Sequence, residues 1–147
     1  MRFATLLALS VVFSVAASAQ PRTSAAPQHT LSIADAAVST SLRAGGSDRN
    51  AVPGSGCSGY IDNAQPSAKL TVEGDGPLAI YAVSGSDTTL LVSDPAGRWH
   101  CSDDANGSNP AVTFARAAPG TYVVWVGTFS PDQAPATLSA VRGQPAW

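Results

Sequence analysis

A short acidic loop contains the residues of this sequence that are best suited to binding a metal ion. Asp103, Asp104 and Asn106 lie within four consecutive positions, and their carboxylate and amide oxygens are ligands that Ca²⁺ prefers. Asp87 and Asp94 lie on segments that a β-sandwich can bring to the same end of the molecule. The loop lacks the bidentate Glu of an EF-hand, and Asp and Asn stabilise turns without an ion. The pattern therefore favours structural turns and no cofactor, and calcium binding is the alternative.

Acid–base or nucleophilic catalysis would require one of the two histidines, His29 and His100. A serine nucleophile needs a base within hydrogen-bond reach, and rigid neighbours must hold that base in place. His29 lies in a segment that we expect to be flexible, and His100 lies beside an Asp-rich turn, where we expect a solvated surface side chain. No G-x-S-x-G nucleophile motif is present. The sequence therefore indicates a protein that is not an enzyme, and a small secreted hydrolase or protease-associated accessory domain is the alternative.

Aromatic residues are the candidates for binding a partner. Tyr60, Tyr122 and Phe129 would form a platform for a peptide, a glycan or an envelope protein if they faced outward together. Trp147 is an exposed tail, a cap over a sheet edge or a recognition element, and the sequence does not choose among these roles. The net charge of −2 at pH 7 argues against a nucleic-acid partner, which would favour clustered Lys and Arg.

The first nineteen residues predict export. Arg2 is followed by an apolar run from Phe3 to Val15 and by the small-residue tripeptide of residues 17–19, the pattern of a secretory signal peptide cleaved after Ala19. The run is shorter than the roughly 20 residues that a membrane-spanning helix needs, and no later segment is longer. We therefore expect a periplasmic or secreted protein with no membrane span.

Two cysteines, Cys57 and Cys101, are expected to form a disulfide in such an oxidising compartment. Closing a loop of about 45 residues stabilises a fold by about 4 kcal/mol in the chain-entropy model.

The remaining residues predict a flexible leader over 20–29 and a single domain over 30–147. Residues 31–43 fit a weak helix or one or two edge strands, of which strand is favoured, and residues 44–56 form a Gly- and Pro-rich loop. Beyond Cys57, short apolar runs recur about every ten residues between turn signals. These runs are 57–61, 68–73, 78–83, 88–92, 98–102, 111–114, 121–129 and 136–141. They predict an all-β, antiparallel, jelly-roll-like sandwich of about eight strands.

Strand alternation assigns side chains to faces. Trp99 and Cys101 share one face of their run, so the indole is expected beside the disulfide in the core, opposite His100. The run 121–129 is apolar on both faces, which is typical of a central strand, and Gly127 suggests a close neighbour there. We expect two facing sheets clamped together by the disulfide.

Several segments resemble a known family in their order and spacing. They are Gly56–Ile61, Asp87–Val92, Asp94–Trp99, Cys101–Asp104, Asn109-Pro110, Pro119–Tyr122 and Trp125–Phe129. Over residues 57–141 the chain resembles the pre-peptidase C-terminal domains, β-sandwich modules attached to secreted bacterial proteases and collagenases, and especially a stand-alone exported group built on that pattern. The resemblance implies that these segments are chiefly structural. It also implies a non-catalytic accessory or binding module.

Overall fold

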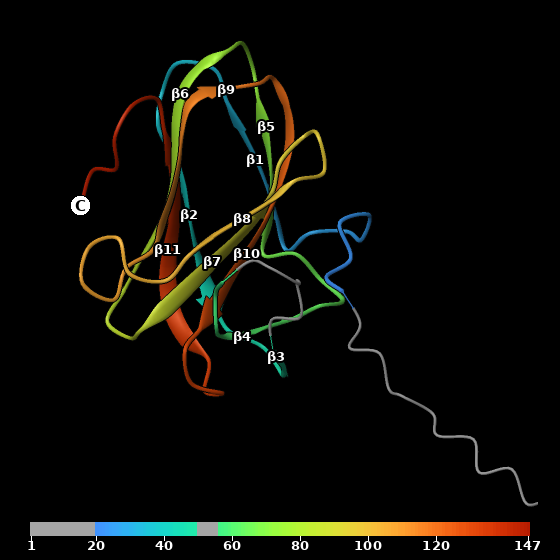
Figure 1. The fold of residues 1–147 in the computed structure, drawn as a ribbon, viewed down its shortest axis with the longest axis vertical. Coiled ribbons are helices and arrows are strands. Elements are labelled where there is room, and N and C mark those ends of the chain that lie inside the picture. The colour runs from blue at the N-terminus through green and yellow to red at the C-terminus, as the bar shows by residue number, and fades with distance from the viewer. Residues whose placement is uncertain (1–19, 50–55) are drawn as a thin grey trace, which may run out of the picture.

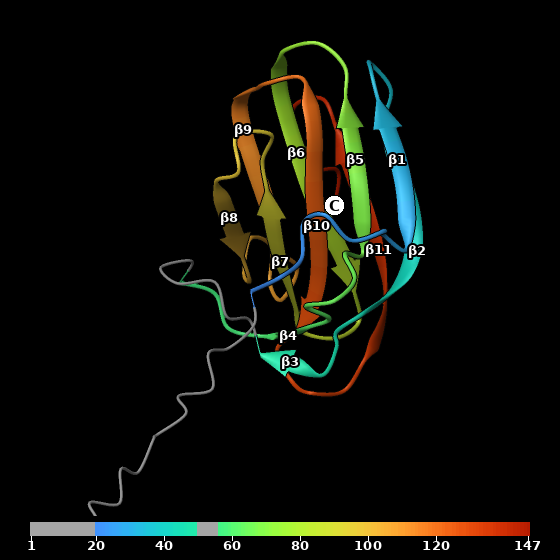
Figure 2. The same cartoon turned by 90° about the vertical axis from the view of Figure 1, so that its right-hand side faces the viewer.

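The computed structural model describes residues 20–49 and 56–147, which form two β-sheets packed face to face (Figures 1 and 2). The predicted signal peptide and residues 50–55 of the predicted loop lie outside the described residues. The seven-stranded sheet contains β1 (His29–Ile33), β3 (Asp48–Arg49), β4 (Tyr60–Ile61), β5 (Ala68–Val72), β7 (Thr88–Ser93), β8 (Trp99–Ser102) and β10 (Gly120–Thr128). The four-stranded sheet contains β2 (Val38–Ala44), β11 (Ala134–Val141), β6 (Gly76–Ser84) and β9 (Ala111–Ala117), in that order. Within the described part of the chain, no helix is long and apolar enough to span a membrane.

All eight apolar runs after Cys57 are strands, β4 to β11, and the predicted all-β sandwich is confirmed. Three further strands precede them. β1 and β2 include the segment 31–43, for which the sequence fitted either a weak helix or one or two edge strands. β3 lies in the predicted loop. The sheets are not wholly antiparallel as predicted, because β1 pairs with β5 in parallel. Between these two strands the chain crosses to the other sheet at β2, and such a crossover lets it return in the same direction.

β10 is the central strand of the seven-stranded sheet. It pairs with β5 along one edge, from Gly120 to Val124, and with β7 along the other, from Val123 to Thr128. Thr128 also pairs with Tyr60 of β4. This position confirms the prediction, which was based on the two apolar faces of the strand. A central strand that is covered on both faces can carry apolar side chains on both, because neither face meets water.

The main hydrophobic core lies between the two sheets. Tyr122 and Val124 of β10 meet inward-facing residues of the four-stranded sheet such as Leu78, Ile80 and Leu138, and all five are at most 2% exposed. In Figure 2 the seven-stranded sheet, with β10, β5 and β1, lies in front of the four-stranded sheet. Burying each of the large aliphatic side chains contributes about 1.5–3 kcal/mol relative to leaving it exposed.

A second, smaller cluster lies on the outer face of the seven-stranded sheet. Val123 and Trp125 of β10 pack there with Ile61 and Leu91. The indole Nε1 of Trp125 donates a hydrogen bond to the carbonyl of Asp62 at 2.9 Å. β10 therefore supplies side chains to two separate clusters, one on each face.

The predicted disulfide joins Cys57 to Cys101, with Cα atoms 6.1 Å apart. Cys101 is on β8 and packs with Trp99 against the outer cluster, so the bridge crosses the outer face of the seven-stranded sheet. It does not clamp the two sheets together, as sequence suggested, because alternation fixes which residues share a face but not which side of the sheet that face is on. Trp99 lies beside Cys101 as predicted but is only partly buried.

The predicted flexible leader is attached to the domain. The amide of Arg22 donates to the carbonyl of Asn63 at 2.8 Å, and the amide of Gln28 donates to the carbonyl of Pro66 at 2.9 Å. Pro21 is buried and His29 already belongs to β1. The prediction of a flexible leader over residues 20–29 is therefore wrong, because backbone hydrogen bonds hold this segment against the domain. Amino-acid composition, on which the prediction was based, does not indicate such bonds.

Gly127 confirms the close approach that its place in β10 suggested. A Cβ atom there would lie 2.5 Å from Oγ1 of Thr89 and 2.7 Å from the carbonyl oxygen of Tyr60. A larger residue would push β7 or β4 away from the central strand.

Trp125→Ala is expected to reduce the free energy of unfolding by about 3–5 kcal/mol, because it empties the centre of the outer cluster and leaves the Asp62 carbonyl without its donor. Trp99→Ala should reduce it by about 1–2 kcal/mol, because that ring is only partly buried. Urea unfolding of the oxidised protein, followed by circular dichroism, measures both. Equal losses for the two variants would contradict the assignment of Trp125 as the anchor.

Candidate functional site

Asp94 is buried at the end of β7 and organises the turn that follows. Its Oδ1 accepts hydrogen bonds from the amides of Ala96 and Arg98 at 2.9 and 3.0 Å. Its Oδ2 accepts one from Nε of Arg98 at 2.8 Å and lies 3.0 Å from Nε2 of His100. Burial alone would raise the pKa of Asp94, but the hydrogen bonds from His100, Arg98 and Ala96 outweigh it and hold the pKa below its usual value. Both oxygens of Asp94, a predicted calcium ligand, therefore already accept hydrogen bonds within this turn.

His100 is part of this network and not the solvated surface residue that sequence suggested. Its ring meets Phe114 edge to face with centroids 4.9 Å apart, and Phe114 meets Tyr122 in the same way at 5.3 Å. Alternation correctly put His100 opposite Trp99 and Cys101. That opposite face, however, turns toward Phe114 of β9 and the main core. The sequence of an edge strand such as β8 does not indicate which of its two faces meets the core.

Tyr122 is a core residue and not part of an outward platform, which corrects the prediction for this side chain. It is 1% exposed, and its hydroxyl donates to the carbonyl of Ala118 at 2.9 Å. A tyrosine bonded to the backbone a few residues upstream is a known corner device of β-sandwiches. Burial, followed by the negative charge of Asp94, raises the pKa of Tyr122.

The other histidine, His29, lies at the opposite edge of the same sheet. Its Nδ1 is 3.3 Å from Oγ1 of Thr40, a contact that joins β1 to β2. Since β1 and β8 are opposite edge strands, the two imidazole rings do not share a site. Each ring contacts one polar side chain of another segment: His29 contacts Thr40 of β2, and His100 contacts Asp94 at the end of β7.

Three loops, β6–β7, β8–β9 and β10–β11, lie toward the lower left of Figure 1. The amide and hydroxyl of Thr88 donate to the carbonyl of Ser108 at 3.2 and 3.3 Å, and the amide of Phe129 donates to the carbonyl of Asp87 at 3.1 Å. We call residues 85–87, 103–110 and 129–133 the acidic loop cluster. Their sequences contain four Asp residues and no Lys or Arg.

The five predicted calcium ligands do not come together. Burial raises the pKa of Asp87, and the neighbouring charges of Asp104 and Asp103 raise it further, so these three carboxylates lie near one another. Asp94 is separated from them by the length of β7, roughly 20 Å at 3.3 Å per residue. Asn106 exchanges backbone hydrogen bonds with Asn109 at 3.0 and 3.1 Å in a tight turn.

In residues 20–49 and 56–147, no three His, Cys, Asp or Glu side chains are grouped so that they could hold a metal ion. Calcium binding by the loop residues stays a prediction, which calorimetric titration tests.

Phe129 is the aromatic residue that this end of the molecule exposes. Its side chain is 57% exposed, the largest value among the large hydrophobic residues of the described chain. Tyr60 pairs with the preceding residue, Thr128, and is half-buried, with the guanidinium carbon of Arg49 5.4 Å from its ring centroid. Two of the three predicted platform residues therefore lie near each other, beside the acidic loop cluster.

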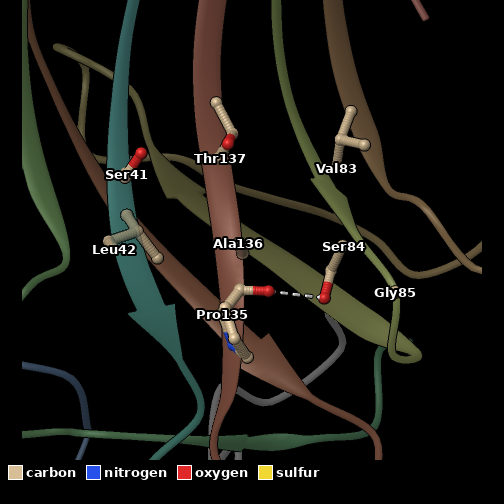
Figure 3. Close-up of a pocket in the computed structure, with 8 residues that line it drawn as sticks. All are labelled: Ser41, Leu42, Val83, Ser84, Gly85, Pro135, Ala136 and Thr137. Carbon is tan, nitrogen blue, oxygen red and sulfur yellow. Dashed lines mark hydrogen bonds between the residues drawn. The ribbon is translucent and has the colours of Figure 1, made fainter.

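A shallow groove of about 340 Å³ lies on the outer face of the four-stranded sheet (Figure 3). Eight residues line it: Ser41, Leu42, Val83, Ser84, Gly85, Pro135, Ala136 and Thr137. This surface was not predicted from the sequence, although the Ser and Thr residues of β2 and β11 indicate an outward polar face. The hydroxyl of Ser84 donates to the carbonyl of Pro135 at 2.8 Å and closes one end of the groove.

Trp147 packs on this same face rather than trailing as a free tail. Its ring lies edge to face with Tyr81 of β6, with centroids 5.2 Å apart, and the Tyr81 hydroxyl donates to the carbonyl of Ala146 at 3.1 Å. Trp147 remains 49% exposed. It covers part of a sheet face and not a sheet edge, which is where the sequence placed the cap.

Comparison with known proteins agrees with the predicted fold. The chain is similar to the pre-peptidase C-terminal domain of a collagenase from Bacillus anthracis, with 17% identity and a TM-score of 0.50 over 82% of this chain and 99% of that domain. It is also similar to PliG from Aeromonas hydrophila, a periplasmic inhibitor of g-type lysozyme, with 13% identity and a TM-score of 0.46 over 81% of this chain and 100% of that one. No family model and no curated protein matches the chain. The chain therefore has a fold like that of the pre-peptidase C-terminal domains.

Asp94→Asn should make the stability of the protein less dependent on pH. The folded-state pKa of Asp94 is lowered from 3.8, so its ionised form stabilises the fold above that value, and the contribution is lost as the pH falls through the folded-state pKa. Between about pH 5 and pH 2, the parent protein should therefore lose more free energy of unfolding than the variant does. Urea unfolding at stepped pH measures the slopes.

Asp75→Asn is the matched control for this experiment. Asp75 is 59% exposed and pairs with the exposed Arg116 at 2.8 Å, and such surface pairs contribute little to stability. Parallel slopes for Asp94→Asn and the parent protein would contradict the role given to the buried carboxylate.

Proposed function

We propose that this protein is an exported, non-catalytic binding module that recognises a partner protein through the acidic loop cluster. The observation that carries the proposal is the exposure of Phe129, 57%, among loops whose charges are all negative. Exposed aromatic residues are common anchors of protein interfaces, and complementary charges around an anchor speed association and select the partner. The partner would present a basic surface with a pocket for the phenyl ring.

Export is supported by the disulfide between Cys57 and Cys101 and by the predicted signal peptide. Because the loops are held on a rigid sandwich by backbone hydrogen bonds, ordering them on binding costs little conformational entropy. The pre-peptidase C-terminal fold agrees with an accessory role, although fold alone does not determine function.

The absence of catalysis is proposed from the contacts of the two histidines. His100 lies 3.0 Å from the buried Asp94 carboxylate and His29 lies 3.3 Å from the Thr40 hydroxyl, at opposite edges of one sheet. A triad needs the base to be oriented by an acid and to reach a nucleophile, and each ring here makes only one of those contacts.

Capture from an envelope extract of the source organism, with the immobilised mature protein as bait, tests the proposed interface. Phe129→Ala should weaken binding of the captured partner by about 30-fold, the effect of a hot-spot residue worth about 2 kcal/mol. Asp103→Asn with Asp104→Asn should slow association and reduce its dependence on salt, because rim charges act mainly on the on-rate. Lys69→Ala, on β5, is the matched control and should bind as the parent protein does. Undiminished binding by Phe129→Ala would contradict the proposal.

Assays of the mature protein against casein and chromogenic esters test the proposed lack of catalysis. No turnover above the uncatalysed rate is expected, because neither histidine combines an acid partner with a nucleophile. Turnover that His100→Gln abolishes and His29→Gln preserves, in variants that still unfold cooperatively, would show that the protein is a hydrolase.

A further inference from the structure

The outer face of the four-stranded sheet is covered over only part of its length. On β6, Ala79 and Tyr81 point outward yet are 0% and 5% exposed, and Trp147 packs on Tyr81. Val83, two residues further along, is 40% exposed and lines the groove. Figure 1 shows the C-terminal segment running along the side of the molecule beside β6 and β11. The covered part and the open groove therefore adjoin along one strand.

The groove offers hydroxyl groups and apolar surface but no charge. Ser41, Thr137 and Val83 occupy one register row across β2, β11 and β6, and Figure 3 shows their side chains standing side by side. None of the eight lining residues is charged. The nearest cation in the register, Arg43, donates to the carbonyl of Gln133 at 3.4 Å. A neutral, hydroxyl-bearing surface complements a neutral ligand rich in hydroxyl groups.

The backbone beneath the groove argues against an extended peptide. β11 is paired on both sides, with β2 and with β6, so the middle of the groove has no free strand edge, and the unpaired edge of β2 lies at its side. Peptides that bind sheets obtain most of their affinity from backbone hydrogen bonds to such an edge. A sugar chain needs only side-chain hydroxyls and an aromatic or aliphatic surface.

Trp147 supplies an aromatic surface on the same face of the sheet. Tyr81 fixes its position through an edge-to-face contact at 5.2 Å and through the hydrogen bond to Ala146 at 3.1 Å. Tyr81 and Val83 are about 7 Å apart along β6, at 3.3 Å per residue. The half-exposed indole therefore packs on the outward residue that precedes Val83 on this face of β6. The electron-rich face of an indole packs well against the C–H face of a pyranose.

We propose that this face binds a neutral polysaccharide, with one sugar ring on Trp147 and the next in the groove against Ser41, Val83 and Thr137. The groove volume of about 340 Å³ falls in the range of roughly 300–1,000 Å³ that is usual for small-molecule sites. This surface is distinct from the acidic loop cluster. It gives the module a second ligand of another chemical class.

Isothermal titration of the full mature protein with β-1,4-glucan and β-1,4-N-acetylglucosamine hexamers tests the inference, and an alginate hexamer is the anionic arm. Binding of at least one neutral hexamer is expected. Trp147→Ala should weaken it at least tenfold, Trp147→Phe should retain most of it, and Thr137→Val should weaken it severalfold without removing the aromatic ring.

Phe129→Ala is the control that separates this site from the protein interface, and it should bind the hexamers as the parent protein does. Failure of both neutral hexamers to bind, stronger binding of alginate than of either, or full binding by Trp147→Ala would each overturn the inference. None of these outcomes bears on partner capture through Phe129.

Discussion

The burial of β10 on both faces is the constraint on which the rest of the structure depends. Tyr122, Val124 and Val126 fill the space between the sheets, while Val123 and Trp125 hold the outer cluster under the disulfide. A strand of this kind needs cover on both faces, because an uncovered face would expose a row of large apolar residues to water. It needs neighbours on both edges, because its buried backbone N–H and C=O groups require hydrogen-bond partners. The pairing of β5, β7 and β4 around it, and the position of Cys57 and Cys101 above it, follow from that requirement.

Two sets of aspartates show how the same residue type acquires different roles. Asp94 accepts hydrogen bonds on both oxygens and its charge is stabilised by the fold, whereas the charge of Asp87 is opposed by burial and by its neighbours Asp103 and Asp104. The first arrangement rigidifies a turn. The second places negative charge at a loop end with no internal compensation from Lys or Arg in those loops, and a positively charged partner would relieve it.

The two proposed surfaces divide the sandwich by chemistry. The acidic loop cluster presents charge around one exposed phenyl ring, and the outer face of the four-stranded sheet presents hydroxyls beside one half-exposed indole. Loops and sheet faces are held by the same backbone ladders, so both surfaces are preformed and neither requires the core to move. This arrangement suits a module whose role is to hold partners in place rather than to transform them.

By itself the sequence determined the strands after Cys57, the pairing of the two cysteines and the division of β10 into two apolar faces. These features depend on local properties, namely the two-residue alternation, the turn residues and the count of cysteines. Only the tertiary structure decided that Tyr122 is internal, that His100 contacts Asp94 and Phe114, that Asp94 is separated from the other acidic residues, and that the disulfide lies outside the sandwich. It also decided that Trp147 returns to Tyr81, a residue far away in the sequence. The reason is that a strand pattern states which residues share a face, whereas packing between distant segments decides whether that face meets the core, a loop or water.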